Sequence, residues 1–179
     1  MKKVTWSIPF IIIFFTAGIF IFKQATFYVM KRTTAAVVNN KTIPVKAYQK
    51  KLAETKTFFS YNKQETENMT SLNKDTLEKM INEQIVQEYA EKNNITVSVD
   101  EIERRYLNVV DGYNQHNQVT SGDEQFLKKI NELYGTNKSD YLIQLKNEIL
   151  GEKVQIKVKM PLVKWLEEQK SRSDIKRFL

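Results

Sequence analysis

The sequence predicts a mainly α-helical fold class: a transmembrane helix at the amino end, then a multi-helix domain with one short β-hairpin. Three observations predict it. The 179 residues include only five Gly and three Pro, too few turn residues for a sandwich or barrel of many short strands. Hydrophobic residues make up 41% of the chain, and after residue 44 they recur at three- or four-residue spacing. Before them stands an uncharged run of nineteen residues, Val4–Phe22.

The first element is this run, which we interpret as a membrane anchor over residues 1–32. As a helix, it would span about 28 Å at 1.5 Å per residue, close to the thickness of the hydrocarbon core of a bilayer. Lysines stand on both sides of it, and Trp6 suits the interfacial aromatic belt. The anchor residues are the large apolar ones: Val4, Trp6, Phe10, Ile11, Ile12, Ile13, Phe14, Phe15, Ile19, Phe20, Ile21 and Phe22.

A cleaved signal peptide is the alternative to an anchor. Its apolar region usually has about 7–15 residues and ends at a small-x-small site. Here the run is longer, and Lys23 occupies the −3 place for cleavage after Ala25, so we favour an uncleaved anchor. The positive-inside rule leaves its orientation open, because basic residues lie on both sides.

A helical domain is expected over residues 33–159, and it opens with a hairpin at Thr33–Ile43. The turn is Asn39-Asn40, since Asn tolerates positive φ. Pro44 suits the first position of a helix that runs to about Tyr61. Polar, aperiodic residues then predict a loop over Asn62–Ser71.

The second helix is expected from about Leu72 or Asp75 to Asn93, where Asn93-Asn94 is a left-handed stop. Ser98–Glu101 matches a capping box and opens a third helix. Polar residues at Asp111–Ser121 predict a loop.

Ser121–Glu124 matches a second capping box, which opens a helix that ends at Gly135. Ser139 is expected to cap the last long helix, which continues to about Lys159 before Pro161 interrupts it.

Residues 160–179 form a basic tail. Within it, Pro161–Lys170 predicts a short amphipathic helix that folds back onto the domain, and Ser171–Leu179 is expected to fray. The alternative is an interfacial helix on the membrane surface. The apolar side chains that would dock are Leu162, Trp165 and Leu166.

The composition of the chain argues against most classes of enzyme active site. Cys is absent, which excludes disulfides, thiolate metal sites and cysteine nucleophiles. The single His, His116, lies in the expected polar loop and leaves little room for His-based metal sites or Ser–His catalysis. We therefore expect no cofactor, no metal and no enzymatic activity.

The net charge of +7 is unevenly distributed. Residues 1–56 carry +9, residues 57–152 carry −7 and residues 153–179 carry +5. A nucleic-acid binder concentrates basic charge on its folded domain, so this pattern argues against nucleic acid as a partner. Basic flanks around an acidic domain favour approach to an anionic surface such as a membrane.

Three segments together resemble the amino-terminal chaperone domain of the SurA/PrsA class of extracytoplasmic foldases. Ala36–Ile43 is similar to the strand-turn of that family, A-x-V-N-G-x-x-I, and precedes a helix with Tyr48 and Leu52. Leu77–Val99 is similar to its next helix and the approach to the one after. The third is Leu133-Tyr134-Gly135 with the apolar residues that follow it: Tyr141, Leu145 and Ile149.

The resemblance covers roughly residues 34–158 and implies a non-catalytic domain that holds unfolded or exported polypeptides. Asn40 replaces the usual turn Gly, and Pro44 replaces the usual capping Ser or Thr. The parvulin-type isomerase domain and the lipid-anchoring Cys of the PrsA branch are absent. The expected location is the cell membrane, single-pass, with residues 33–179 extracytoplasmic; the oligomeric state stays open.

Aromatic residues are the candidates for client binding, although most aromatics of the domain are expected to fill the core between helices. Two alternatives to a holdase remain: a membrane-tethered module that docks one defined partner, and a prolyl isomerase remnant. The aromatic candidates, placed at helix ends, beside loops or in the tail, are Phe58, Phe59, Tyr61, Tyr113 and Trp165.

Overall fold

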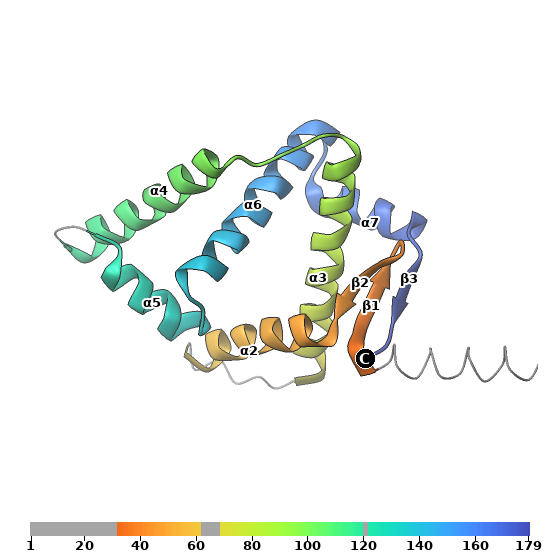
Figure 1. The fold of residues 1–179 in the computed structure, drawn as a ribbon, viewed down its shortest axis with the longest axis horizontal. Coiled ribbons are helices and arrows are strands. Elements are labelled where there is room, and N and C mark those ends of the chain that lie inside the picture. The colour runs from red at the N-terminus through yellow and green to blue at the C-terminus, as the bar shows by residue number, and fades with distance from the viewer. Residues whose placement is uncertain (1–31, 62–68, 120–121) are drawn as a thin grey trace, which may run out of the picture.

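Six helices and a three-stranded antiparallel sheet make up the described part of the chain, residues 32–61, 69–119 and 122–179 of a computed structural model (Figure 1). The fold is therefore mainly helical, as predicted. The strands are β1 (Thr34–Val38), β2 (Lys41–Pro44) and β3 (Ile175–Arg177). The helices are α2 (Val45–Tyr61), α3 (Met69–Lys92), α4 (Val99–Asn117), α5 (Glu124–Tyr134), α6 (Lys138–Val158) and α7 (Leu162–Arg172).

The predicted hairpin is confirmed. β1 pairs antiparallel with β2, and the turn residues Asn39 and Asn40 have φ of 46° and 71°. Pro44 closes β2 instead of starting the helix, so α2 begins one residue later, at Val45. A proline is tolerated there because β2 is an edge strand, and the N–H that proline lacks is not needed for pairing inside the sheet.

The end of the chain forms a strand, so the prediction that Ser171–Leu179 frays is wrong. β3 pairs antiparallel with β1, which makes β1 the central strand in the order β2-β1-β3. The Phe178 N–H donates to the Ala35 carbonyl at 3.0 Å, and the Asn39 N–H donates to the Asp174 carbonyl at 2.9 Å. The first and last described segments thus meet in one sheet (Figure 1).

The Asn39 side chain joins the hairpin turn to this last segment and to α3. Its Oδ1 accepts from the Asp174 N–H at 3.0 Å. Its Nδ2 donates to Glu88 Oε2 at 3.0 Å and to Ser173 Oγ at 3.3 Å. Glu88 is only 7% exposed, so Asn39 supplies a hydrogen bond that a buried carboxylate requires.

The second and third helices differ in extent from the prediction. α3 begins at Met69, earlier than expected, and ends before Asn94 with φ of 55°. The Ser98 capping box is confirmed. α4 then continues to Asn117, so the loop predicted over Asp111–Ser121 is wrong, and His116 is an exposed helical residue.

Packing explains why α4 continues. The ring of Tyr113 meets the ring of Phe126 edge-on, with centroids 5.6 Å apart, so the apolar face of α4 is buried beyond Gly112. Burial of that face outweighs the low helix propensity of the polar, Gly-containing stretch. The helix ends at Gln118, which has the left-handed φ of 55°.

Two helix starts are also corrected. α5 is preceded by Asp123, which makes no side-chain cap bond, so a capping box led by Ser121 is not the start signal; Ser121 itself lies outside the described residues. α6 is capped by Asn137, whose Oδ1 accepts the Asp140 N–H at 3.0 Å, and not by Ser139. The predicted stops at Gly135 and Lys159 are confirmed, with φ of 63° and 55°.

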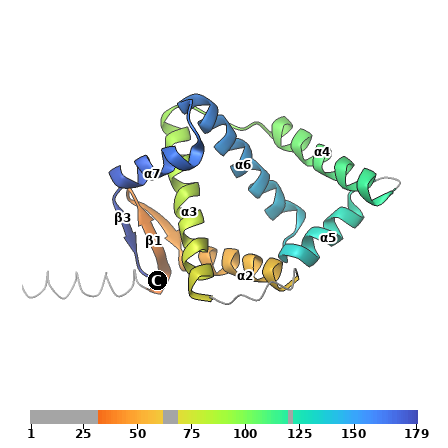
Figure 2. The same ribbon diagram turned by 180° about the vertical axis from the view of Figure 1, so that it is seen from behind.

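Two hydrophobic clusters hold the fold together, and α6 contributes to both. The first lies between the sheet, α3, α7 and the carboxy-terminal half of α6, which provides Leu150 and Val154. The second lies between α4, α5 and the amino-terminal half of α6, which provides Leu145. Viewed from both sides, α6 runs diagonally from one cluster to the other (Figures 1 and 2).

The tail docks on the domain, as the sequence predicts. Trp165, in the first turn of α7, is 4% exposed, and its ring packs edge-on against Tyr89 of α3 with centroids 4.9 Å apart. Glu78 of α3 adds two ion pairs to this segment, with Lys170 at 3.0 Å and Arg177 at 2.7 Å. Burial raises the pKa of Glu78, but hydrogen bonds from the two cations outweigh it and lower that pKa overall.

The membrane anchor predicted at Val4–Phe22 lies outside the described residues. Within residues 32–61, 69–119 and 122–179, none of the helices has the length and apolar character that a membrane span requires.

Candidate functional site

Three of the aromatic candidates lie together at the end of α2. Phe58 stacks on Tyr134 of α5 with centroids 5.2 Å apart, and Phe59 meets Phe58 edge-on at 5.8 Å. Tyr61 is 46% exposed, and its hydroxyl accepts a hydrogen bond from Lys129 Nζ. Phe58 and Phe59 are partly buried, and Phe58 joins α2 to α5, whereas Tyr61 presents the more accessible ring.

The other two candidates belong to different hydrophobic clusters. Tyr113 is partly buried against the second cluster, where it contacts Phe126. Trp165 lies inside the first cluster and is 4% exposed. Its burial corrects the expectation that it faces clients, because a ring in the core offers no surface to a partner. The five aromatics therefore do not form one binding surface.

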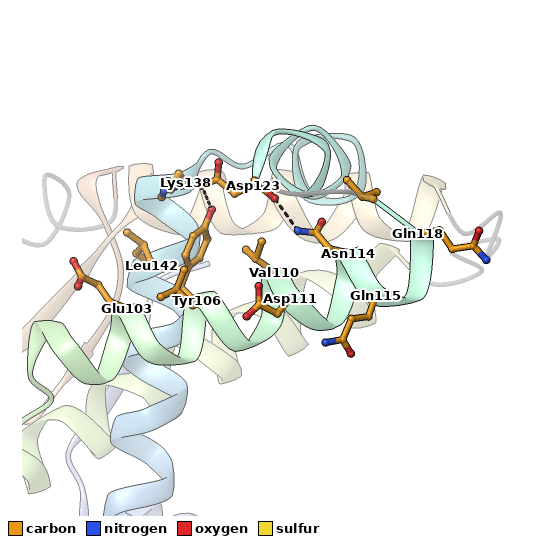
Figure 3. Close-up of a pocket in the computed structure, with 13 residues that line it drawn as sticks. Glu103, Tyr106, Val110, Asp111, Asn114, Gln115, Gln118, Asp123, Lys138 and Leu142 are labelled. Carbon is orange, nitrogen blue, oxygen red and sulfur yellow. Dashed lines mark hydrogen bonds and ion pairs between the residues drawn. The ribbon is translucent and has the colours of Figure 1, made fainter.

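A groove with a volume of about 840 Å³ runs along α4 (Figure 3). Its walls come from α4, the segment that leads into α5, and the first turns of α6. This volume falls within the range of ligand-binding pockets in proteins. The lining residues are Glu103, Tyr106, Leu107, Val110, Asp111, Asn114, Gln115, Gln118, Val119, Gly122, Asp123, Lys138 and Leu142.

Two neighbouring stripes of α4 line this groove, each with the four-residue spacing that keeps side chains on one face of a helix. The inner stripe is Tyr106, Val110 and Asn114, with an amide at its last position, and the cap residue Gln118 follows it. The outer stripe carries, in order, an acid, an apolar side chain, a second acid and an amide: Glu103, Leu107, Asp111 and Gln115.

The floor of the groove is fixed by a hydrogen-bonded set around Asp123. Its Oδ2 accepts from the Tyr106 hydroxyl at 2.5 Å and from Lys138 Nζ at 2.7 Å. The bonds from Lys138 and then Tyr106 lower the pKa of Asp123, whereas burial raises the pKa of the Tyr106 hydroxyl and its bond to Asp123 raises it further. At neutral pH, Asp123 is thus ionised and its charge is matched by Lys138.

The outer stripe keeps uncompensated negative charge. Glu103 and Asp111 are both exposed, and neither has an ion-pair partner within residues 32–61, 69–119 and 122–179. Between them, Leu107 is 55% exposed, so a large apolar side chain faces solvent between the two carboxylates. The groove therefore combines an apolar strip with an acidic rim.

Asn114 closes one end of the groove. Its Nδ2 donates to the Gly122 carbonyl at 2.9 Å and ties α4 to the segment before α5. Its Oδ1 accepts no hydrogen bond from a described residue. In Figure 3, Tyr106, Val110 and Asn114 point from α4 towards the segment that carries Asp123.

A family model described as a SurA-like N-terminal domain matches residues 1–133, about three quarters of the chain. The chain belongs to this family. The resemblance inferred from the sequence is therefore confirmed, and no parvulin-type isomerase domain is found in the 179 residues. Comparison with curated proteins gives no match. The family suggests a chaperone-like or protein-interaction role for this SurA-like protein.

The sequence pattern does not predict the groove of this SurA-like domain, because the polar residues of Asp111–Ser121 favour a loop over a helix. A continuous helix was needed to align the outer stripe. The usable signal was Leu107, which stands among polar residues at four-residue spacing from Glu103 and Asp111.

A second hollow of about 440 Å³ lies between α3, α6 and α7. Glu83 lines it, and burial raises the pKa of this carboxyl, although Lys51 and Lys79 oppose the shift. The part of the chain that the structure describes contains no group of three or more His, Asp or Glu arranged to hold a metal ion.

Proposed function

We propose that this SurA-like protein is a membrane-anchored, extracytoplasmic chaperone-like protein that holds unfolded exported polypeptides without catalysis. The single observation that carries the proposal is the α4 groove, an open hollow of about 840 Å³ with exposed Leu107 in a polar rim. Unfolded chains expose apolar side chains and unpaired backbone groups, and a groove with an apolar strip and amide side chains can meet both needs.

The amide residues favour recognition without strict sequence preference. Gln115 and Gln118 are exposed at the groove, and each amide has a donor and an acceptor. Such groups pair with the backbone of any extended segment. This is the behaviour required of a protein that holds varied clients.

The anchoring half of the proposal rests on the uncharged run Val4–Phe22. Membrane fractionation of the native chain, followed by protease treatment of intact cells, tests it. The expected result is a membrane-bound protein whose residues 33–179 are cleaved from outside. A soluble protein, or a protected domain, would contradict the anchoring or the orientation respectively.

The holding function is tested by thermal aggregation of several unrelated proteins in the presence of the full chain in mild detergent. We expect suppression for most of them, and weaker suppression by Leu107→Asn. Ile143→Asn is the matched control, because Ile143 is also 55% exposed but does not line the groove. Stoichiometric binding to one protein, with no suppression of the others, would favour a docking module instead.

A further inference from the structure

We infer that the α4 groove selects extended polypeptide segments in which an apolar residue is flanked, two positions away on each side, by Lys or Arg. This inference rests on the proposed function, since it names the class of segment that the groove takes. Three features of the groove carry it: its spacing, its charge and its amide residues.

The spacing of the outer stripe matches an extended chain. Glu103 and Asp111 are eight residues apart on α4, which separates them by about 12 Å along the helix axis. Four residues of an extended chain rise about 13 Å, and alternate residues project to the same side. A segment laid along α4 therefore places its positions i, i+2 and i+4 over Glu103, Leu107 and Asp111 in turn.

The charge of the groove favours cations at the outer positions. Of the three carboxylates that line it, Asp123 is matched by Lys138 at 2.7 Å, whereas Glu103 and Asp111 have no such partner among the described residues. Lys138 is the one basic residue in the lining, so the groove keeps a net negative charge. A Lys or Arg side chain can bury its aliphatic stem on the apolar strip and bring its charge to this rim.

Leu107 supplies the apolar position between the two carboxylates. Its side chain is 55% exposed, next to the buried Tyr106 and Val110 that form the floor. An apolar residue at i+2 of the segment would cover Leu107 and remove its exposed area from water. The exposed amide of Gln115, which follows Asp111 on the outer stripe, offers a donor and an acceptor to the backbone of the bound segment.

The test measures binding of fluorescent peptides to the full chain in mild nonionic detergent at low salt. The first peptide has a Lys-Ser-Leu-Ser-Lys centre, the second a Glu-Ser-Leu-Ser-Glu centre, and the third carries its lysines three positions from the Leu. We expect the first peptide to bind most tightly and to weaken as salt is added, because exposed ion pairs are screened.

Charge variants then locate the binding. Glu103→Gln and Asp111→Asn are each expected to weaken binding of the first peptide by about two- to five-fold, the range of exposed ion pairs. Changing both residues to Lys is expected to reverse the preference towards the Glu peptide. Glu132→Gln on α5 is the control, because Glu132 is exposed but does not line the groove, and it should leave all affinities unchanged. Melting temperatures verify that each variant folds.

Two results would overturn the inference. One is equal affinity for the first and third peptides, which would show that binding does not depend on the distance of the lysines from the Leu. The other is a Lys double variant that keeps the original preference. If aggregation is still suppressed in either case, the holding function stands and only the selectivity is wrong; if no peptide binds and no client is protected, the proposed function itself fails.

Discussion

Trp165→Ala tests whether α7 is an integral part of the domain. The Trp165 side chain is 4% exposed and packs against Tyr89. A buried Trp removes about 150–250 Å² from water, which corresponds to about 4–6 kcal/mol at about 25 cal/mol per Å². Measured costs of Trp→Ala in protein cores are about 3–5 kcal/mol, against a total stability of about 5–15 kcal/mol.

The assay is thermal unfolding of the full chain in mild detergent, followed by circular dichroism at 222 nm. At about 2–4 °C per kcal/mol for a chain of this size, Trp165→Ala should lower the Tm by about 6–20 °C. Val163→Ala is the control on the same helix, since Val163 is 70% exposed and its loss should cost less than about 0.5 kcal/mol. Equal Tm values for the two variants would refute the docked position of α7.

Substitutions of two glutamates of α3 should change the Tm with opposite pH dependence. Substitutions of the two asparagines of the hairpin turn should differ in their cost in stability. Because the pKa of Glu83 is raised, the folded state favours the protonated form of this side chain. Its contribution to the free energy of unfolding is lost as pH rises through that pKa, so Glu83→Gln should raise the Tm at pH 7 and not at pH 3. Because the pKa of Glu78 is lowered, the folded state favours its ionised form, which stabilises the fold at neutral pH. Glu78→Gln should therefore lower the Tm at pH 7, and this difference in Tm should shrink as pH falls through that pKa. Asn39→Gly removes the hydrogen bond to the buried Glu88 carboxylate and the one from the Asp174 N–H, and it should cost about 1–3 kcal/mol in chemical denaturation. Asn40→Gly should be nearly neutral, because Gly tolerates the same φ. A Tm difference for Glu83→Gln that grows at low pH, or equal losses for the two Asn variants, would contradict these expectations.

Local signals in the sequence predicted most of the fold. The Asn39-Asn40 turn, the Ser98 cap and the Gly135 stop depend on a few adjacent residues, and all three are confirmed. The docking of Trp165 was also predictable, because a Trp in an amphipathic segment needs an apolar partner.

The failures share a physical cause, which is stabilisation by residues distant in sequence. β3 has three residues and little intrinsic strand signal, and it forms because β1 offers an open edge. The second half of α4 is helical because Phe126 covers Tyr113. The groove depends on that extension and on Lys138, contributed by the start of α6.

Photo-crosslinking from single positions tests most directly whether the α4 groove holds unfolded polypeptides. A photoreactive amino acid is placed at Leu107 in one variant and at Ile143 in another, two positions with the same 55% exposure. With a mixture of unfolded exported proteins, we predict crosslinks to many clients from position 107 and few from position 143. Equal yields from both positions, or crosslinks from position 143 alone, would contradict the groove as the binding site.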